Sequence, residues 1–109
     1  MTHLDKAYLN NIISLLGSEQ FIPLKDQFIR DCDAASAALE AAAAKGDEAQ
    51  IKKQAHLLKG VLAQYGARQG EAIAARLAGD LPSNWRDVTQ ALLQEIASVC
   101  EEMAALIGG

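Results

Sequence analysis

The sequence predicts an all-α fold, an antiparallel four-helix bundle with a short additional N-terminal helix. Apolar residues recur at spacings of three and four along most of the chain, which is the repeat of an amphipathic α-helix. No segment alternates apolar and polar residues over the length of a strand, and no Asn-Gly pair indicates a hairpin. Gly, Pro and Asp residues separate the helical segments, and such short connections favour antiparallel neighbours.

The first two predicted helices span residues 4–16 and 19–45. Gly17 separates them, Ser18 is a candidate cap for the second, and Pro23 is early enough in that helix to be tolerated. The expected apolar face of the first helix consists of Leu4, Tyr8, Ile12 and Leu15. The expected apolar face of the second consists of Phe21, Leu24, Phe28, Cys32, Ala35, Leu39 and Ala42.

The remaining predicted helices span residues 47–65, 67–78 and 83–107. Gly46 suits the end of one helix and Asp47 the N-cap of the next, while a helix end or a tight crossing is expected at Gly66. The third apolar face is Ile51, Ala55, Leu58, Leu62 and Tyr65; Ile73 and Leu77 mark the fourth helix. The last helix carries Trp85, Val88, Leu92, Ile96, Val99, Met103 and Leu106.

Length and composition narrow the classes of function. The 109 residues are expected to form one domain, residues 1–109, and the net charge of -4 argues against nucleic acid as a partner. No apolar segment approaches the length that spans a membrane, and no leader-like segment opens the chain, so a cytoplasmic protein is expected. Cys32 and Cys100 are far apart without a CxxC pair, which favours two reduced thiols.

One histidine lies within the third predicted helix, on the side away from the core. At 100° per residue, His56 projects roughly 140° from the middle of the apolar face, and it is therefore expected to be exposed. The residues one turn later are Lys59 and Gly60, which alone can contact it from that side. A glycine inside a helix costs about 1 kcal/mol relative to alanine, so Gly60 needs a reason.

A role for His56 as a phosphoryl acceptor would explain the glycine at position 60. Imidazole is a nucleophile, and a phosphoryl group on His56 would need open space beside Gly60 and a cation such as Lys59. Phosphoryl transfer depends mainly on positioning and charge, so no general base is required. The alternatives are a solvated surface histidine, a solvated lysine and a glycine that permits close helix packing.

The residues Ala55-His56-Leu57-Leu58-Lys59-Gly60, followed by Gly66-Ala67, resemble the signature of histidine-containing phosphotransfer (HPt) domains. The opening Leu4-Asp5, the helix that contains Phe28, and Leu77 also match the pattern, so the resemblance covers roughly the whole chain. The sequence departs from it at Val61, where serine or alanine is common, at Gly70, where leucine is usual, and at Ala78, where glutamate often stands.

The resemblance implies a phosphoryl carrier without kinase activity, which relays phosphoryl groups between aspartates of receiver domains. It implies that His56 is phosphorylated, that Lys59 supports the phosphoryl group and that Gly60 gives access to it. The expected partners are receiver domains of response regulators or hybrid sensor kinases, and the chain itself is expected to be a monomer. No cofactor or metal is expected here, because Mg²⁺ would come with the receiver.

A docking surface for the receiver is expected around the histidine. Its candidate residues are Lys52, Lys53, Leu57, Val61, Ala63 and Gln64. Leu57 and Val61 are equally compatible with isolated exposed apolar residues. Three other classes of function stay open: a non-catalytic helical adaptor, a metal site, and an autonomous enzyme. The metal site is disfavoured because His3 is expected in a mobile terminus and no HxxxH or ExxH pair occurs, and the enzyme because no phosphate-binding glycine loop or acid–base pair is visible.

Overall fold

The computed structural model describes residues 3–106, and every regular element in that range is an α-helix. The helices are α1 (Lys6–Leu16), α2 (Ser18–Lys45), α3 (Glu48–Gln64), α4 (Arg68–Ala78) and α5 (Trp85–Leu106). The prediction of an all-α fold is confirmed. Each helix limit lies within two residues of the expected position, except that the predicted end at residue 107 falls outside the described residues.

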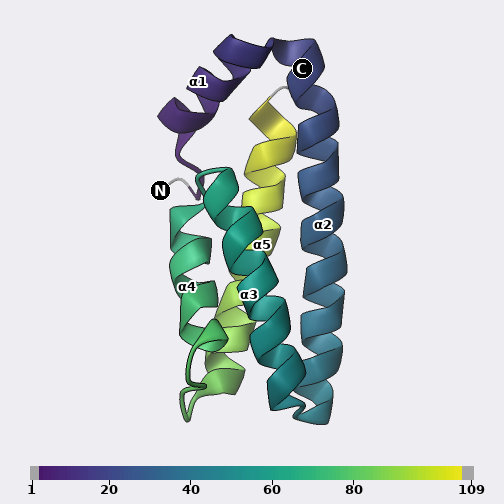
Figure 1. Ribbon diagram of the computed structural model, residues 1–109, viewed down its shortest axis with the longest axis vertical. Coiled ribbons are helices and arrows are strands. Elements are labelled where there is room, and N and C mark those ends of the chain that lie inside the picture. Colours follow the sequence, from purple (N-terminus) through teal and green to yellow (C-terminus); the bar gives the residue numbers. More distant parts are fainter. Residues whose placement is uncertain (1–2, 107–109) are drawn as a thin grey trace.

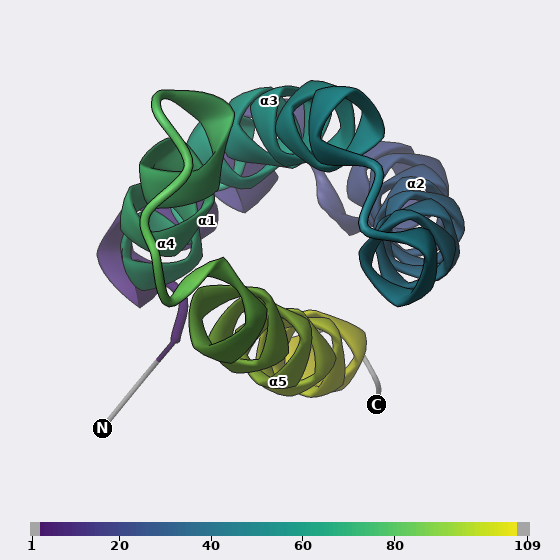
Figure 2. The ribbon, with the colours of Figure 1, turned by 90° about the horizontal axis from the view of Figure 1, so that it is seen from below.

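Four of the helices lie around a common core. In Figure 1, α2 and α4 run downward while α3 and α5 run upward. Helix α3 packs against α2 and α4, and α5 packs against the same two helices, so the four form the closed ring seen end-on in Figure 2. The largest fully buried side chains include Phe21, Phe28, Leu39, Ile51, Leu58, Leu62, Leu77, Leu92 and Met103.

Local residue chemistry sets the helix ends. The side chain of Asp47 accepts a hydrogen bond from the backbone N–H of Gln50 (3.2 Å) and so caps α3. Gly46 ends α2 in the left-handed conformation, with φ of 67°, where a side chain would be strained. The expected cap at Ser18 is wrong: Ser18 is the first residue of α2, and Gly17 occupies the N-cap position with φ of 87°.

Helix α1 lies across one end of the ring instead of along it (Figure 1). Its predicted apolar face is therefore wrong in part: Leu15 is 85% exposed and Tyr8 is 38% exposed, whereas Leu9 is fully buried. A helix that crosses the end of a bundle covers the core over only part of its length. An apolar repeat that continues to the last turn of α1 consequently leaves its final residues in solvent.

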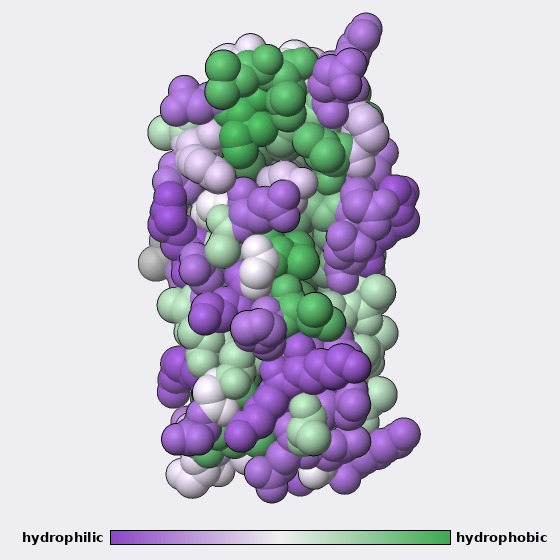
Figure 3. Space-filling model, in the orientation of Figure 1, coloured by the Kyte–Doolittle hydropathy of each residue, from purple (hydrophilic) through white to green (hydrophobic). Residues whose placement is uncertain are grey.

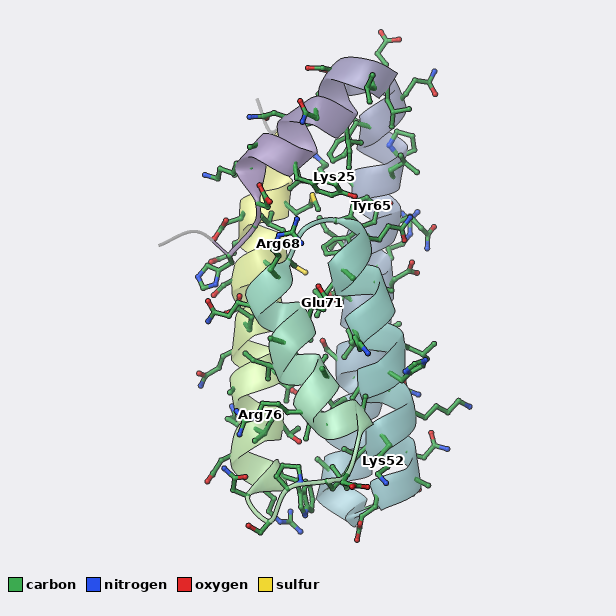
Figure 4. The ribbon with its side chains drawn as sticks, turned by 60° about the vertical axis from the view of Figure 1, so that its left-hand side comes forward. Lys25, Lys52, Tyr65, Arg68, Glu71 and Arg76 are labelled. Carbon is green, nitrogen blue, oxygen red and sulfur yellow. The ribbon has the colours of Figure 1, made fainter. Side chains whose placement is uncertain are left out.

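Leu24 is a second departure from the expected core, since it is 39% exposed. The ring of Phe28 packs edge-on against Tyr65, with 4.9 Å between the ring centroids. Tyr65 is the C-cap of α3, labelled near the upper end of that helix in Figure 4. The part of α2 before Phe28 therefore extends past α3, and Leu24 has no α3 surface against which to pack.

The expectation of a mobile terminus at His3 is also wrong. The backbone N–H of His3 donates to Oε2 of Glu102 (2.7 Å), and its Nδ1 lies 2.8 Å from Oε2 of Glu95. Glu95 is only 5% exposed, so this pairing satisfies a buried carboxylate on α5. His3 is thus held against α5 by the carboxylates of Glu95 and Glu102.

Candidate functional site

The helix that carries His56 is held by a continuous apolar face. Ile51, Ala55, Leu58 and Leu62 are all buried, which is the face that the sequence predicts for this helix. His56 follows a buried alanine and points outward, and the structure places it among the exposed residues, as its projection predicts. The backbone of the histidine is therefore fixed while its side chain is accessible.

The space beside the imidazole is open at Gly60. A Cβ atom built on Gly60 would meet nothing within 4 Å outside its own helical turn. Close helix packing therefore does not explain this glycine. Lys59 is partly buried, and among residues 3–106 neither its ammonium nor the imidazole of His56 takes part in a side-chain hydrogen bond. Both groups are available to a ligand, and Lys59 lies at the i+3 position from the histidine.

A groove between α2 and α3 begins one residue from His56. Leu57, which is 51% exposed, and Val61 line it from α3. The groove has a volume of about 370 Å³, and Figure 3 shows apolar surface between α3 and α2 at mid-height of the molecule. Its remaining lining residues, which are not among the predicted site residues, are Asp31, Ala34, Ala35 and Gln54.

The residues that α2 contributes to the groove depend on the register between α2 and α3, which the sequence does not reveal. Ala34 and Ala35 are small, and they leave the groove open where a larger side chain would fill it. From the sequence alone, alanines in α2 are indistinguishable from ordinary helix formers. Only the packing of α2 against α3 places them beside Leu57.

The other candidate docking residues lie elsewhere on α3. Lys53 is exposed, whereas Lys52, labelled in Figure 4 on the lower part of α3, and Ala63 are partly buried. Gln64 is exposed at the opposite end of the helix, where its backbone carbonyl accepts a hydrogen bond from the hydroxyl of Tyr8 (3.1 Å). The structure therefore brings Leu57 and Val61 together in one groove and leaves Gln64 near α1.

Gly66 has a structural role that differs from that of Gly60. Its φ is 76°, and a Cβ there would lie 3.0 Å from Cδ2 of Tyr8 and 3.2 Å from Cβ of Asp5. Its carbonyl accepts a hydrogen bond from the backbone N–H of Asp5 (2.9 Å). Gly66 therefore ends α3 and lets the segment before α1 approach closely, so the predicted helix end is confirmed.

Asp5 links the start of α1 to the start of α4. Its carboxylate accepts a hydrogen bond from the backbone N–H of Tyr8 (3.1 Å) and ion-pairs with Arg68 (3.3 Å). The hydrogen bond from Tyr8, and then Arg68, hold the pKa of Asp5 below its usual value. Both contacts hold the segment before α1 against the start of α4.

Gly70, where the resemblance would have a leucine, permits close packing of α4. A Cβ on Gly70 would lie 3.1 Å from Cδ1 of Leu62 and 3.5 Å from Cγ of Glu95. A leucine side chain would therefore displace both neighbours. Gly70 leaves room for the side chain of Glu95, whose buried carboxylate is paired with His3.

Cys32 and Cys100 are brought together although 67 residues separate them in the sequence. Cys32 is fully buried on α2, and Cys100 is partly buried on α5. Interaction with the Cys100 thiol raises the pKa of Cys32, with burial adding to the effect. The same interaction lowers the pKa of Cys100.

Residues 3–106 form neither a metal centre nor a membrane-spanning helix. Within residues 3–106, no set of three or more His, Cys, Asp and Glu side chains is arranged to hold a metal ion. Over the same residues, no helix combines the length and the apolar character needed to cross a membrane.

Comparison with known proteins gives one match. A family model described as the Hpt domain matches residues 23–107, a range that includes most of α2 and all of α3 to α5, with His56, Lys59 and Gly60. No curated protein and no solved structure gives a significant match. The matched range covers well over half of the chain, and the chain therefore belongs to the Hpt domain family.

Proposed function

We propose that the chain is a phosphoryl carrier in a phosphorelay, with His56 as the residue that is phosphorylated. The observation that carries this proposal is the exposed His56 one turn before an unobstructed Gly60, in a chain of the Hpt domain family. Histidine phosphotransfer in phosphorelays is what this family does. We also propose that α2 to α5 form the antiparallel four-helix bundle predicted from the sequence, in which α3 presents His56 to solvent.

The transfer step needs little from the carrier beyond position and charge. A ring nitrogen of His56 attacks the phosphorus of a receiver aspartyl phosphate; an N–P bond forms, the P–O bond to the aspartate breaks, and the aspartate leaves as a carboxylate. The phosphoryl group then occupies the space beside Gly60, where Lys59 can donate to its oxygens. The reverse step, toward a second receiver domain, returns the imidazole to its neutral state.

The α2–α3 groove is the proposed docking surface for the receiver. Leu57 and Val61 give it an apolar floor, and Lys52 and Lys53 lie elsewhere on α3. Apolar burial would supply affinity, while the lysines would steer the acidic phosphorylation site of the receiver. The receiver would bring its own Mg²⁺, so the carrier needs no metal or other cofactor. We further propose that the carrier acts as a monomer in the cytoplasm.

The test is transfer from a phosphorylated receiver domain to the carrier and then to a second receiver. Wild-type protein should remove the label from the first receiver and deliver it to the second. His56→Gln should do neither while keeping the fold, because the side chain lies outside the core. His3→Gln is the matched control, since it removes the other histidine of the chain, and it should transfer normally. A helical adaptor without phosphoryl chemistry would leave the first receiver's label unchanged in all three proteins.

A further inference from the structure

The two cysteines lie on two helices that pack against each other. Cys32 is on α2 and Cys100 on α5, and these antiparallel helices are in direct contact. Near the other end of the same pair, the Arg86 guanidinium on α5 donates to the carbonyl of Ala43 on α2 (3.5 Å). From that contact, Cys32 lies about 17 Å along α2 and Cys100 about 21 Å along α5, at 1.5 Å per residue. The register therefore places the two cysteines at the same level, within about one helical turn, in agreement with the interaction between their thiols.

The two thiols differ in accessibility and in charge state. Cys100 is partly exposed, and interaction with the Cys32 thiol lowers its pKa, which favours a thiolate there. Cys32 is 0% exposed, and its raised pKa keeps it protonated. An accessible thiolate beside a buried second thiol is the arrangement in which one sulfur reacts first and the other resolves it.

We propose that Cys32 and Cys100 form a reversible oxidation site, at which a small hydroperoxide converts the thiol pair into a disulfide that joins α2 to α5. The sulfur of Cys100 attacks the peroxide; an S–O bond forms, the O–O bond breaks, and Cys100 becomes a sulfenic acid as the first water leaves. The sulfur of Cys32 then attacks that sulfenic sulfur; the S–S bond forms, the S–O bond breaks, and the Cys32 proton leaves with the hydroxyl group as the second water. The two thiols give two electrons, which reduce the peroxide to water, and an external dithiol reverses the reaction.

This inference is independent of the phosphoryl carrier, because it uses neither His56 nor the α2–α3 groove. The disulfide would close the chain between α2 and α5, and a cross-link over that many residues restricts the unfolded chain strongly. An increase in melting temperature of roughly 5–15 °C on oxidation is expected.

The test treats purified full-length protein with hydrogen peroxide, followed by trypsin digestion under non-reducing conditions. The cysteines then fall in two separate peptides, residues 31–45 and 87–109. We expect an intramolecular cross-link between these peptides, lost on reduction with dithiothreitol, in protein that remains monomeric. Absence of this cross-link, or its formation only between two copies of the chain, would overturn the proposal, and both outcomes are read on the wild-type protein.

Two variants test the order of reaction. In Cys32→Ala, Cys100 should form a sulfenic acid that dimedone traps. In Cys100→Ala, the buried Cys32 should react at least about tenfold more slowly. Equal rates in the two variants would contradict the assigned roles, since they would mean that burial does not protect Cys32.

Discussion

Lys59 is the proposed cation for the phosphoryl group on His56. It lies at i+3 from His56, and a phosphoryl group on that histidine would bring an anion within its reach. Replacing Lys59 with alanine should slow phosphoryl transfer roughly tenfold, because a charge-assisted hydrogen bond to a partly solvated anion contributes about 1.5 kcal/mol.

The measurement for Lys59 is the transfer rate from a phosphorylated receiver, with melting temperature as a second readout. Lys53→Ala removes an equal charge from an exposed position on the same helix and is the control. If both variants slow transfer equally, Lys59 contributes only to long-range steering and does not support the phosphoryl group.

Gly60 can be tested by opposite effects on stability and activity. Because a Cβ at this position meets no neighbour, Gly60→Ala should stabilise the protein by about 0.4–1 kcal/mol through helix propensity and a restricted unfolded chain. Gly60→Leu should keep the helix yet block transfer, since its side chain would cover the histidine. Thermal unfolding and transfer rate on the same proteins measure both effects, and normal transfer by Gly60→Leu would rule out a role in access.

At the scale of the elements, the turn between α3 and α4 depends on a glycine that is both left-handed and crowded. Gly66→Ala should destabilise the protein by about 2–4 kcal/mol, because the new Cβ is strained at φ of 76° and presses on Tyr8 and Asp5. Gly46→Ala has a similar φ of 67° but meets nothing within 4 Å, so it should cost only about 1–2 kcal/mol. Chemical denaturation measures the free energy of unfolding of both variants, and the difference between them reports the crowding at Gly66. Equal losses of stability would show that crowding contributes nothing there.

The groove between α2 and α3 offers a second comparison at this scale. Leu57→Ala should raise the KM for a phosphorylated receiver about 5- to 20-fold, since apolar area that docking would bury is removed. Leu15→Ala is the matched control, because this leucine is 85% exposed on α1 and lies outside the groove. An unchanged KM for Leu57→Ala would place the docking surface elsewhere on the molecule.

For the whole molecule, the sequence predicted best the helices that lie along the core. In α3 the buried residues continue over the full helix, so its helical repeat identifies both the core face and the outward direction of His56. In α1 the repeat failed, because the helix crosses the end of the ring and only Leu9 is fully buried. A repeat identifies an apolar face, but it does not state how much of that face another helix covers.

Contacts between residues far apart in the sequence could not be predicted, because the helical repeat does not show which helices are neighbours. The pairing of His3 with Glu95, the contact of Cys32 with Cys100, and the alanines opposite Leu57 each depend on which helices are neighbours and on their register. Spacing within one helix carries no such information. The site residues predicted from the sequence therefore all lie on α3, the helix of His56, while the partners supplied by α2 were missed.

The central claim is that the phosphoryl group resides on His56, and locating it on the chain tests this most directly. Trypsin separates the two histidines into peptides 1–6 and 54–59, each with one imidazole. After incubation with a phosphorylated receiver domain, digestion at neutral pH and fragmentation by mass spectrometry should find an acid-labile phosphoryl group on His56 in peptide 54–59. Phosphate in peptide 1–6, or a receiver that loses its phosphate while peptide 54–59 stays unmodified, would contradict the account.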